Sequence, residues 1–200
     1  MNANAEDFDI NSRLKMIENM MAEGRRSTES WGWTFVLWGL AYFVATAWSS
    51  VGSGSKLAWP VTMIAAGILT GFGAGRNKNG QPETTLGRAL GAVWAAMGMS
   101  LFIVLFSLGL SGHSDMHVFV AIIGAMLGSA NAASSLMLKW KMQFACAVVW
   151  LASVIVASFG TEQQAFIAFL VATFLCQIVF GIYAMMCESR RRKQMGAVHA

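Results

Sequence analysis

Residues 89–110 read ALGAVWAAMGMSLFIVLFSLGL, and this apolar stretch decides the fold class. It contains no Asp, Glu, Lys or Arg. At 1.5 Å per residue, a helix of about 20 apolar residues crosses a bilayer core of roughly 30 Å. A helix that is apolar on every face must be buried or surrounded by lipid. The stretch therefore predicts a transmembrane helix.

Five further runs are equally apolar and also lack those four charged residue types, so the sequence contains six in all: 31–51, 57–75, 89–110, 117–138, 142–160 and 165–187. Only 12% of the 200 residues are charged, about half the share of a soluble domain. The sequence predicts an all-α, polytopic membrane protein with six transmembrane helices. Its parts would be a cytoplasmic leader (1–30), a transmembrane domain (31–187) and a basic tail (188–200).

The basic residues predict the orientation of these spans. With alternate threading, every Lys and Arg except Lys56 falls on one side of the membrane. Short loops rich in Lys and Arg face the cytoplasm. We therefore expect both termini in the cytoplasm, and we attribute the net charge of +4 to this bias rather than to nucleic-acid binding. The first run is followed by five others and does not resemble a cleaved signal peptide.

The leader contains a predicted amphipathic helix at residues 9–24, DINSRLKMIENMMAEG. Its apolar residues recur at intervals of four, three and four, at Ile10, Leu14, Ile17 and Met21. Asp9 is placed to cap the helix and Gly24 to end it. One interpretation has this helix on the membrane surface or folded back on the cytoplasmic loops. The other has it bind a partner helix or dimerise.

Small residues at intervals of four predict close packing of helices in lipid. The second run carries Gly67, Gly71 and Gly75, and the fourth carries Gly124 and Gly128. The contacts that they make would lie within one chain or between copies of it.

Three tryptophans, Trp38, Trp94 and Trp150, stand 56 residues apart in the sequence. Each lies at a similar depth in an odd-numbered run, which suggests a triplicated helix hairpin as a hypothesis. The amides of Asn131 and Gln177 lie near the same depth. These five residues would form a pocket with aromatic walls for a flat or amide-bearing small molecule. Alternatively, the amides bond only to neighbouring helices. The other tryptophans lie near span ends, as membrane anchors do.

Residues that could support catalysis are not evident. No carboxylate or Lys lies within a predicted span, and no Ser/His/Asp or Cys/His constellation is recognisable, so we expect neither an enzyme, a proton-coupled carrier nor a cofactor. His113, Asp115 and His117 are potential ligands of a divalent metal. Helix capping by Asp115 and an ordinary polar loop explain the same residues, so no metal is predicted.

Residues 16–43, MIENMMAEGRRSTESWGWTFVLWGLAYF, resemble a family of small uncharacterised bacterial membrane proteins. In that family a short helix with a Met/Ile pair precedes a first span with a Trp-Gly motif, here Trp38 and Gly39. The resemblance implies a bacterial six-span protein without catalytic residues. In length, span number and orientation the chain is also similar to the substrate-binding subunits of energy-coupling-factor vitamin transporters, some of which surround a planar ligand with tryptophans.

These features predict an accessory or sensory membrane component, not an enzyme, that acts through the leader and its helix faces. The alternative is a small-molecule binding or transport subunit. A cavity beside Trp38, Trp94 and Trp150 would favour the alternative, and solid packing there would favour the first interpretation.

Overall fold

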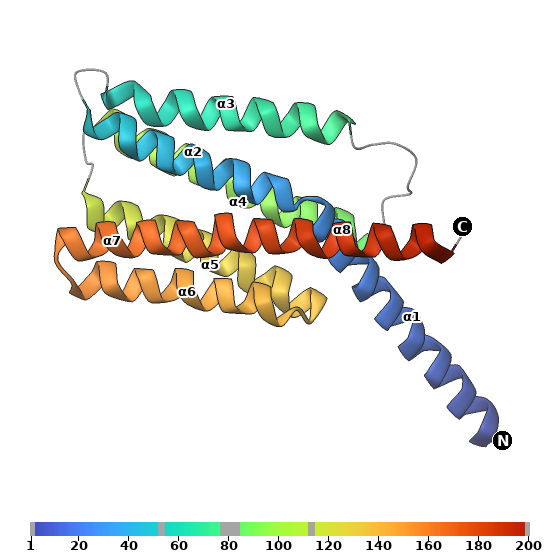
Figure 1. Ribbon diagram of the computed structural model, residues 1–200. Helices are drawn as coiled ribbons and strands as arrows, with labels where there is room; N and C mark the ends of the chain where they lie inside the picture. Colours follow the sequence, from blue (N-terminus) through green and yellow to red (C-terminus); the bar gives the residue numbers. More distant parts are fainter. Residues whose placement is uncertain (1–2, 52–54, 77–84, 112–114, 199–200) are drawn as a thin grey trace.

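A computed structural model describes residues 3–51, 55–76, 85–111 and 115–198, and their regular secondary structure is entirely helical (Figure 1). The helices are α1 (Ala3–Ser30), α2 (Gly32–Ser50), α3 (Ser55–Arg76), α4 (Thr85–Ser111), α5 (Met116–Leu138), α6 (Lys141–Phe159), α7 (Glu162–Thr173), the π-helix η1 (Phe174–Val179) and α8 (Phe180–Val198). The last three form one continuous helix. The predicted all-α class is confirmed.

Each predicted apolar run coincides with a helix. Four helical segments are long and apolar enough to cross a membrane: Leu86–Ser111, Met116–Leu138, Lys141–Phe159 and Glu162–Gln194. A shorter apolar helix covers Leu57–Gly73. Helix α2 is not in this group of four. By length and composition these helices are compatible with a membrane protein.

The helix of the leader starts earlier and ends later than the predicted helix at residues 9–24. Helix α1 begins before Asp9 and continues through Gly24 to Ser30, so these residues neither cap it nor end it. A Cβ at Gly24 would lie 2.7 Å from Leu138 Cδ2 and 2.8 Å from Leu86 Cδ2, which shows that α1 packs closely on α4 and α5 there. The first half of α1 extends away from the other helices (Figure 1). The end of α1 lies against the α5–α6 connection, where Arg25 donates to the carbonyl oxygen of Lys139 at 3.3 Å.

The other helices form two groups joined by the long C-terminal helix. Helices α5 and α6 are an antiparallel hairpin that packs against α7 (Figure 1). Helix α3 packs against α2, and α2 packs against η1 and α8. Helix α4 packs mainly against α5 and α1. Helix α4 meets α2 where Trp94 packs edge-on against Phe35, with ring centroids 5.3 Å apart. The buried core is richest between α5, α6 and α7, at Val120, Ile123, Trp150 and Phe169.

The predicted glycine contacts divide into two classes. A Cβ at Gly124 would lie 3.0 Å from the carbonyl oxygen of Trp150, and one at Gly128 would lie 2.9 Å from Leu151. Both glycines therefore let α5 approach α6. By contrast, a Cβ at Gly67 or Gly71 would have no described atom within 4 Å, so these two make no contact within the described part of the chain. The surroundings of Gly75 lie outside the described residues.

Close approach also occurs at glycines outside the predicted series. A Cβ at Gly32 would lie 2.9 Å from the carbonyl oxygen of Gly181, and one at Gly181 would lie 2.8 Å from that of Gly32. Here the backbones of α2 and α8 are too close together to leave room for a side chain at either glycine. A Cβ at Gly39 would lie 2.8 Å from Cβ of Gln177. These glycines bring α2 against the C-terminal helix and so position one wall of the cavity described below.

Candidate functional site

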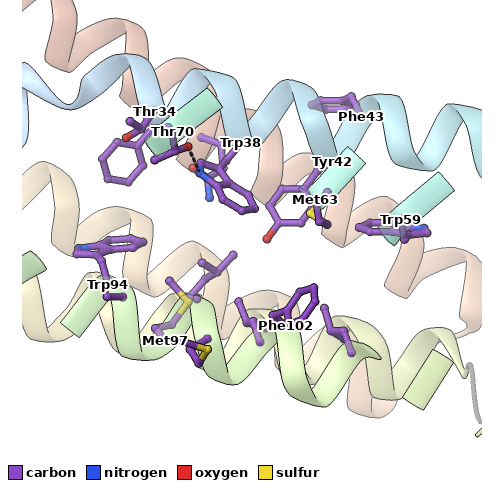
Figure 2. A pocket seen from close by; sticks show the side chains of 18 of the residues that line it. Thr34, Trp38, Tyr42, Phe43, Trp59, Met63, Thr70, Trp94, Met97 and Phe102 are labelled. Carbon is purple, nitrogen blue, oxygen red and sulfur yellow. Dashed lines mark hydrogen bonds between the residues drawn. The ribbon is translucent and has the colours of Figure 1, made fainter. Parts of the chain in front are cut away.

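A cavity of about 3320 Å³ lies between α2 and α3 on one side and α4 on the other (Figure 2). It exists because α3 packs on α2 while α4 is held by α5 and α1. Small-molecule pockets usually enclose about 300–1,000 Å³, so this space suits an extended molecule. Its middle section is lined mainly by aromatic and methionine side chains: Trp38, Tyr42, Trp59, Met63, Trp94, Met97, Phe102 and Phe169.

Two of the three evenly spaced tryptophans belong to this wall. The indole N–H of Trp38 donates to Oγ1 of Thr70 at 3.1 Å (Figure 2). The indole N–H of Trp94 donates to Oγ of Ser134, also at 3.1 Å. Each bond satisfies the polar edge of an indole inside an apolar region. The rings are thereby held as fixed walls of the cavity.

Gln177 also lines the cavity, although only 3% of the residue is exposed. Its Oε1 atom has no hydrogen-bond partner in the described part of the protein. Buried polar atoms normally have a partner, and an exception calls for an explanation. Gln177 lies in η1, and π-helical turns are frequent at functional sites. The atom is itself buried, so it does not face the open part of the cavity.

Trp150 and Asn131 lie elsewhere. Trp150 is fully buried on α6, with its ring centroid 6.4 Å from that of Phe169. Asn131 is buried on α5 and donates from Nδ2 to the carbonyl oxygen of Leu127 at 2.8 Å. Neither lines the cavity. The five predicted ligand-binding residues therefore divide into three at the cavity, Trp38, Trp94 and Gln177, and two in the packed core.

The three hairpins of the repeat hypothesis differ in the hydrogen bond of their tryptophan. In the first two hairpins the tryptophan of the leading helix donates to a hydroxyl of the following helix. In the third hairpin, Trp150 Nε1 and Thr173 Oγ1 are both buried and have no hydrogen-bond partner among the described residues. The recurring arrangement thus covers two hairpins of three.

An aromatic cluster at the wall of the cavity was not predicted. The ring centroid of Trp59 lies 4.8 Å from that of Phe119 and 6.0 Å from that of Tyr42, and Tyr42 lies 5.9 Å from Phe169. Trp59 was interpreted as a membrane anchor, because it stands near the start of a span. Tyr42 stands four residues after Trp38, on the same helix face. This spacing could have predicted that both rings belong to the same wall.

One end of the cavity is basic. We call it the arginine end: Arg26, Arg88, Arg191 and Arg192 line it, with Glu23 and Glu188. Arg191 pairs with the buried Glu29, which lies beside the cavity, and Arg192 pairs with Glu188 at 2.5 Å. Neighbouring Arg25 donates to the carbonyl oxygen of Leu138 at 2.9 Å.

Positive charge is crowded at the arginine end. Arg191 lies beyond residue 187, where the last predicted span ends. Its burial, and then the charges of Arg26 and Arg25, lower the pKa of its guanidinium group. Among the described residues, no carboxylate forms an ion pair with Arg26 or Arg88. The site therefore retains positive charge that its own carboxylates do not neutralise.

The opposite end of the cavity contains Asp115 and Glu162. Asp115 caps α5 by accepting from the backbone N–H of His117 at 2.8 Å. The ring nitrogen Nδ1 of His117 lies 2.7 Å from the carbonyl oxygen of Ala157. His113 lies outside the described residues, and no group of three potential metal ligands occurs within them. Asp115 and His117 thus have local structural roles.

Comparisons with protein-family models, with curated proteins and with solved structures find no significant match to this chain.

Proposed function

We propose that this protein is an integral membrane protein that binds a largely apolar small molecule in the cavity between α2–α3 and α4. The observation that carries the proposal is the open space beside Trp38 and Trp94, where an accessory protein would be packed solid. The indole rings that line this space are fixed by hydrogen bonds. The protein would act as a binding or transport subunit rather than as an enzyme.

We further propose that it crosses the bacterial cytoplasmic membrane six times with both termini inside. Helices α2 and α3 would cross beside the four longer apolar segments. The clustering of Arg25, Arg26, Arg88 and Arg191 at one end of the helices supports this orientation, because basic residues collect on the cytoplasmic side.

The orientation is testable with single cysteines. In a variant whose native cysteines are replaced by alanine, we expect Gln163→Cys to react on intact cells with a membrane-impermeant maleimide. Ser189→Cys should react only after the cells are opened. Both positions are exposed, so each serves as the control for the other. The reverse labelling pattern would place the termini outside.

Filling the cavity tests the binding proposal. Gly98 lines the cavity, and a Cβ there would meet no described atom within 4 Å, so we expect Gly98→Trp to place its indole in the space. Gly67→Trp is the matched control, because Gly67 has equally open surroundings but does not line the cavity. We expect mass spectrometry of extracts from the purified proteins to find the same ligand with wild type and Gly67→Trp. Its amount should fall about tenfold or more with Gly98→Trp, equivalent to about 1.4 kcal/mol. Equal amounts in all three proteins would contradict the proposal.

A second function, partner binding through α1, is supported by a separate observation. Ile10, Leu14 and Ile17 are each more than half exposed, at 55%, 53% and 51%. They lie on the part of α1 that extends from the bundle (Figure 1). Such a face would pack against a partner helix or lie on the membrane surface.

Substitution of this face separates the two interpretations. If α1 binds a partner, changing Ile10, Leu14 and Ile17 to serine should reduce the mass of the solubilised complex. Changing the exposed residues Lys15 and Asn19 to serine is the control on the opposite face. An unchanged mass together with weaker binding of α1 peptides to liposomes would instead assign the apolar face to the membrane surface.

A further inference from the structure

The arginine end and the apolar section belong to the same cavity. Arg88 and Trp94 lie on α4, six residues or about 9 Å apart along the helix axis, and both line the space. Methionine and aromatic side chains then continue the wall along α4, at Met97 and Phe102 (Figure 2). A bound molecule would therefore meet cationic groups at one end and apolar groups over the rest of its length.

The charges at this end favour an anion. Arg191 and Arg192 are engaged by Glu29 and Glu188. Arg26 and Arg88 have no such partner in the described part of the chain, and Glu23 is the other carboxylate that lines this end. Guanidinium groups bind phosphate oxygens strongly because they donate two parallel hydrogen bonds.

We propose that the cavity holds one anionic phospholipid, with its phosphate at Arg26 and Arg88 and its acyl chains along Trp94, Met97 and Phe102. This inference rests on the proposed function, whose ligand it assigns to a chemical class. A free phosphate ion would leave the apolar walls uncovered. A zwitterionic lipid would carry its own cation to the arginines. Basic pockets between transmembrane helices are recognised sites for anionic headgroups.

The test is native mass spectrometry of the full-length protein, delipidated and then supplied with equal amounts of phosphatidylglycerol and phosphatidylcholine of the same acyl chains. We expect wild type to retain one phosphatidylglycerol preferentially. The double variant Arg26→Gln, Arg88→Gln should still retain lipid, but its preference for phosphatidylglycerol should fall by about 30-fold, since two basic residues at roughly 1 kcal/mol each contribute about 2 kcal/mol toward anionic lipid.

Three further arms make the outcome specific. The double variant Arg190→Gln, Lys193→Gln removes the same charge from exposed positions outside the cavity, and its preference should remain that of wild type. Gly98→Trp should retain about tenfold less of either lipid. Inorganic phosphate should not displace the bound phosphatidylglycerol.

The results distinguish failure of the inference from failure of the proposed function. Lipid bound without a preference, or a preference that survives loss of Arg26 and Arg88, would overturn the assignment of an anionic lipid while leaving a ligand cavity. Displacement by inorganic phosphate would assign the arginine end to a free anion. Equal retention by wild type and Gly98→Trp would show that the lipid binds outside the cavity, which contradicts the inference and the proposed site together.

Discussion

Replacing Gly181 with leucine is expected to force α8 away from α2 and to lower the stability of the solubilised protein. A Cβ at this position would lie 2.7 Å from Cγ2 of Val36, 2.8 Å from the carbonyl oxygen of Gly32 and 3.0 Å from the backbone nitrogen of Val36. Two of these are backbone atoms, so a rotamer change cannot relieve the overlap. Overpacking of this kind costs about 1–3 kcal/mol, and we expect the upper part of that range in thermal unfolding in detergent.

Gly71→Leu is the matched control for this substitution. Both variants introduce the same side chain into an apolar helix, but a Cβ at Gly71 has no described atom within 4 Å. The monomer should therefore unfold at the wild-type temperature. A change of oligomer size in Gly71→Leu would assign the glycine series of α3 to an interface between copies. Equal destabilisation by both substitutions would contradict the α2–α8 contact.

Arg191→Ala is expected to have the second large effect, because it leaves Glu29 without its cation. Glu29 is 5% exposed and pairs with Arg191 across α1 and α8. Removing one partner of a buried ion pair costs about 3–5 kcal/mol. The Arg191 side chain is 28% exposed, so solvent reduces the effect, and we expect a loss of about 2–3 kcal/mol in the free energy of unfolding.

Two further variants test the cause of that loss. Arg192→Ala removes the ion pair between Arg192 and Glu188. The Arg192 side chain is 71% exposed, so this substitution should cost less than about 1 kcal/mol. Glu29→Gln combined with Arg191→Met removes both buried charges and should restore much of the stability. A double variant as unstable as Arg191→Ala would show that packing, rather than an uncompensated carboxylate, accounts for the effect.

The sequence predicted the helices well because the requirement for a span is simple. A run of about 20 residues without charge becomes a helix wherever its backbone must satisfy its own hydrogen bonds. For example, residues 117–138 were predicted as a span, and α5 covers Met116–Leu138. The leader was less predictable. Glycine is common at helix ends, which is why Gly24 was predicted to end the helix. In the structure α1 continues past Gly24, which packs against Leu86 and Leu138.

The candidate site was only partly predictable, because spacing gives depth but not direction. Trp38 and Trp150 were predicted at the same depth, yet one lines the cavity and the other is enclosed between α5, α6 and α7. The same limit applies to glycine. Gly67 and Gly128 share a spacing of four with their neighbours, but only Gly128 faces another helix. Which face of a helix is covered depends on the rotation of every neighbouring helix, and that information is spread over the whole chain.

The π-helical turn at Phe174–Val179 has a consequence for the whole C-terminal helix. Such a turn holds one residue more than an α-helical turn, and one residue corresponds to a rotation of about 100°. Phe169 before the turn contacts Tyr42 of α2, and Gly181 after the turn also lies against α2. Twelve residues of regular α-helix would place Phe169 and Gly181 about 120° apart around the helix, and the wider turn removes about 100° of that rotation. The extra residue therefore keeps both halves of the C-terminal helix in register with the same neighbour, α2.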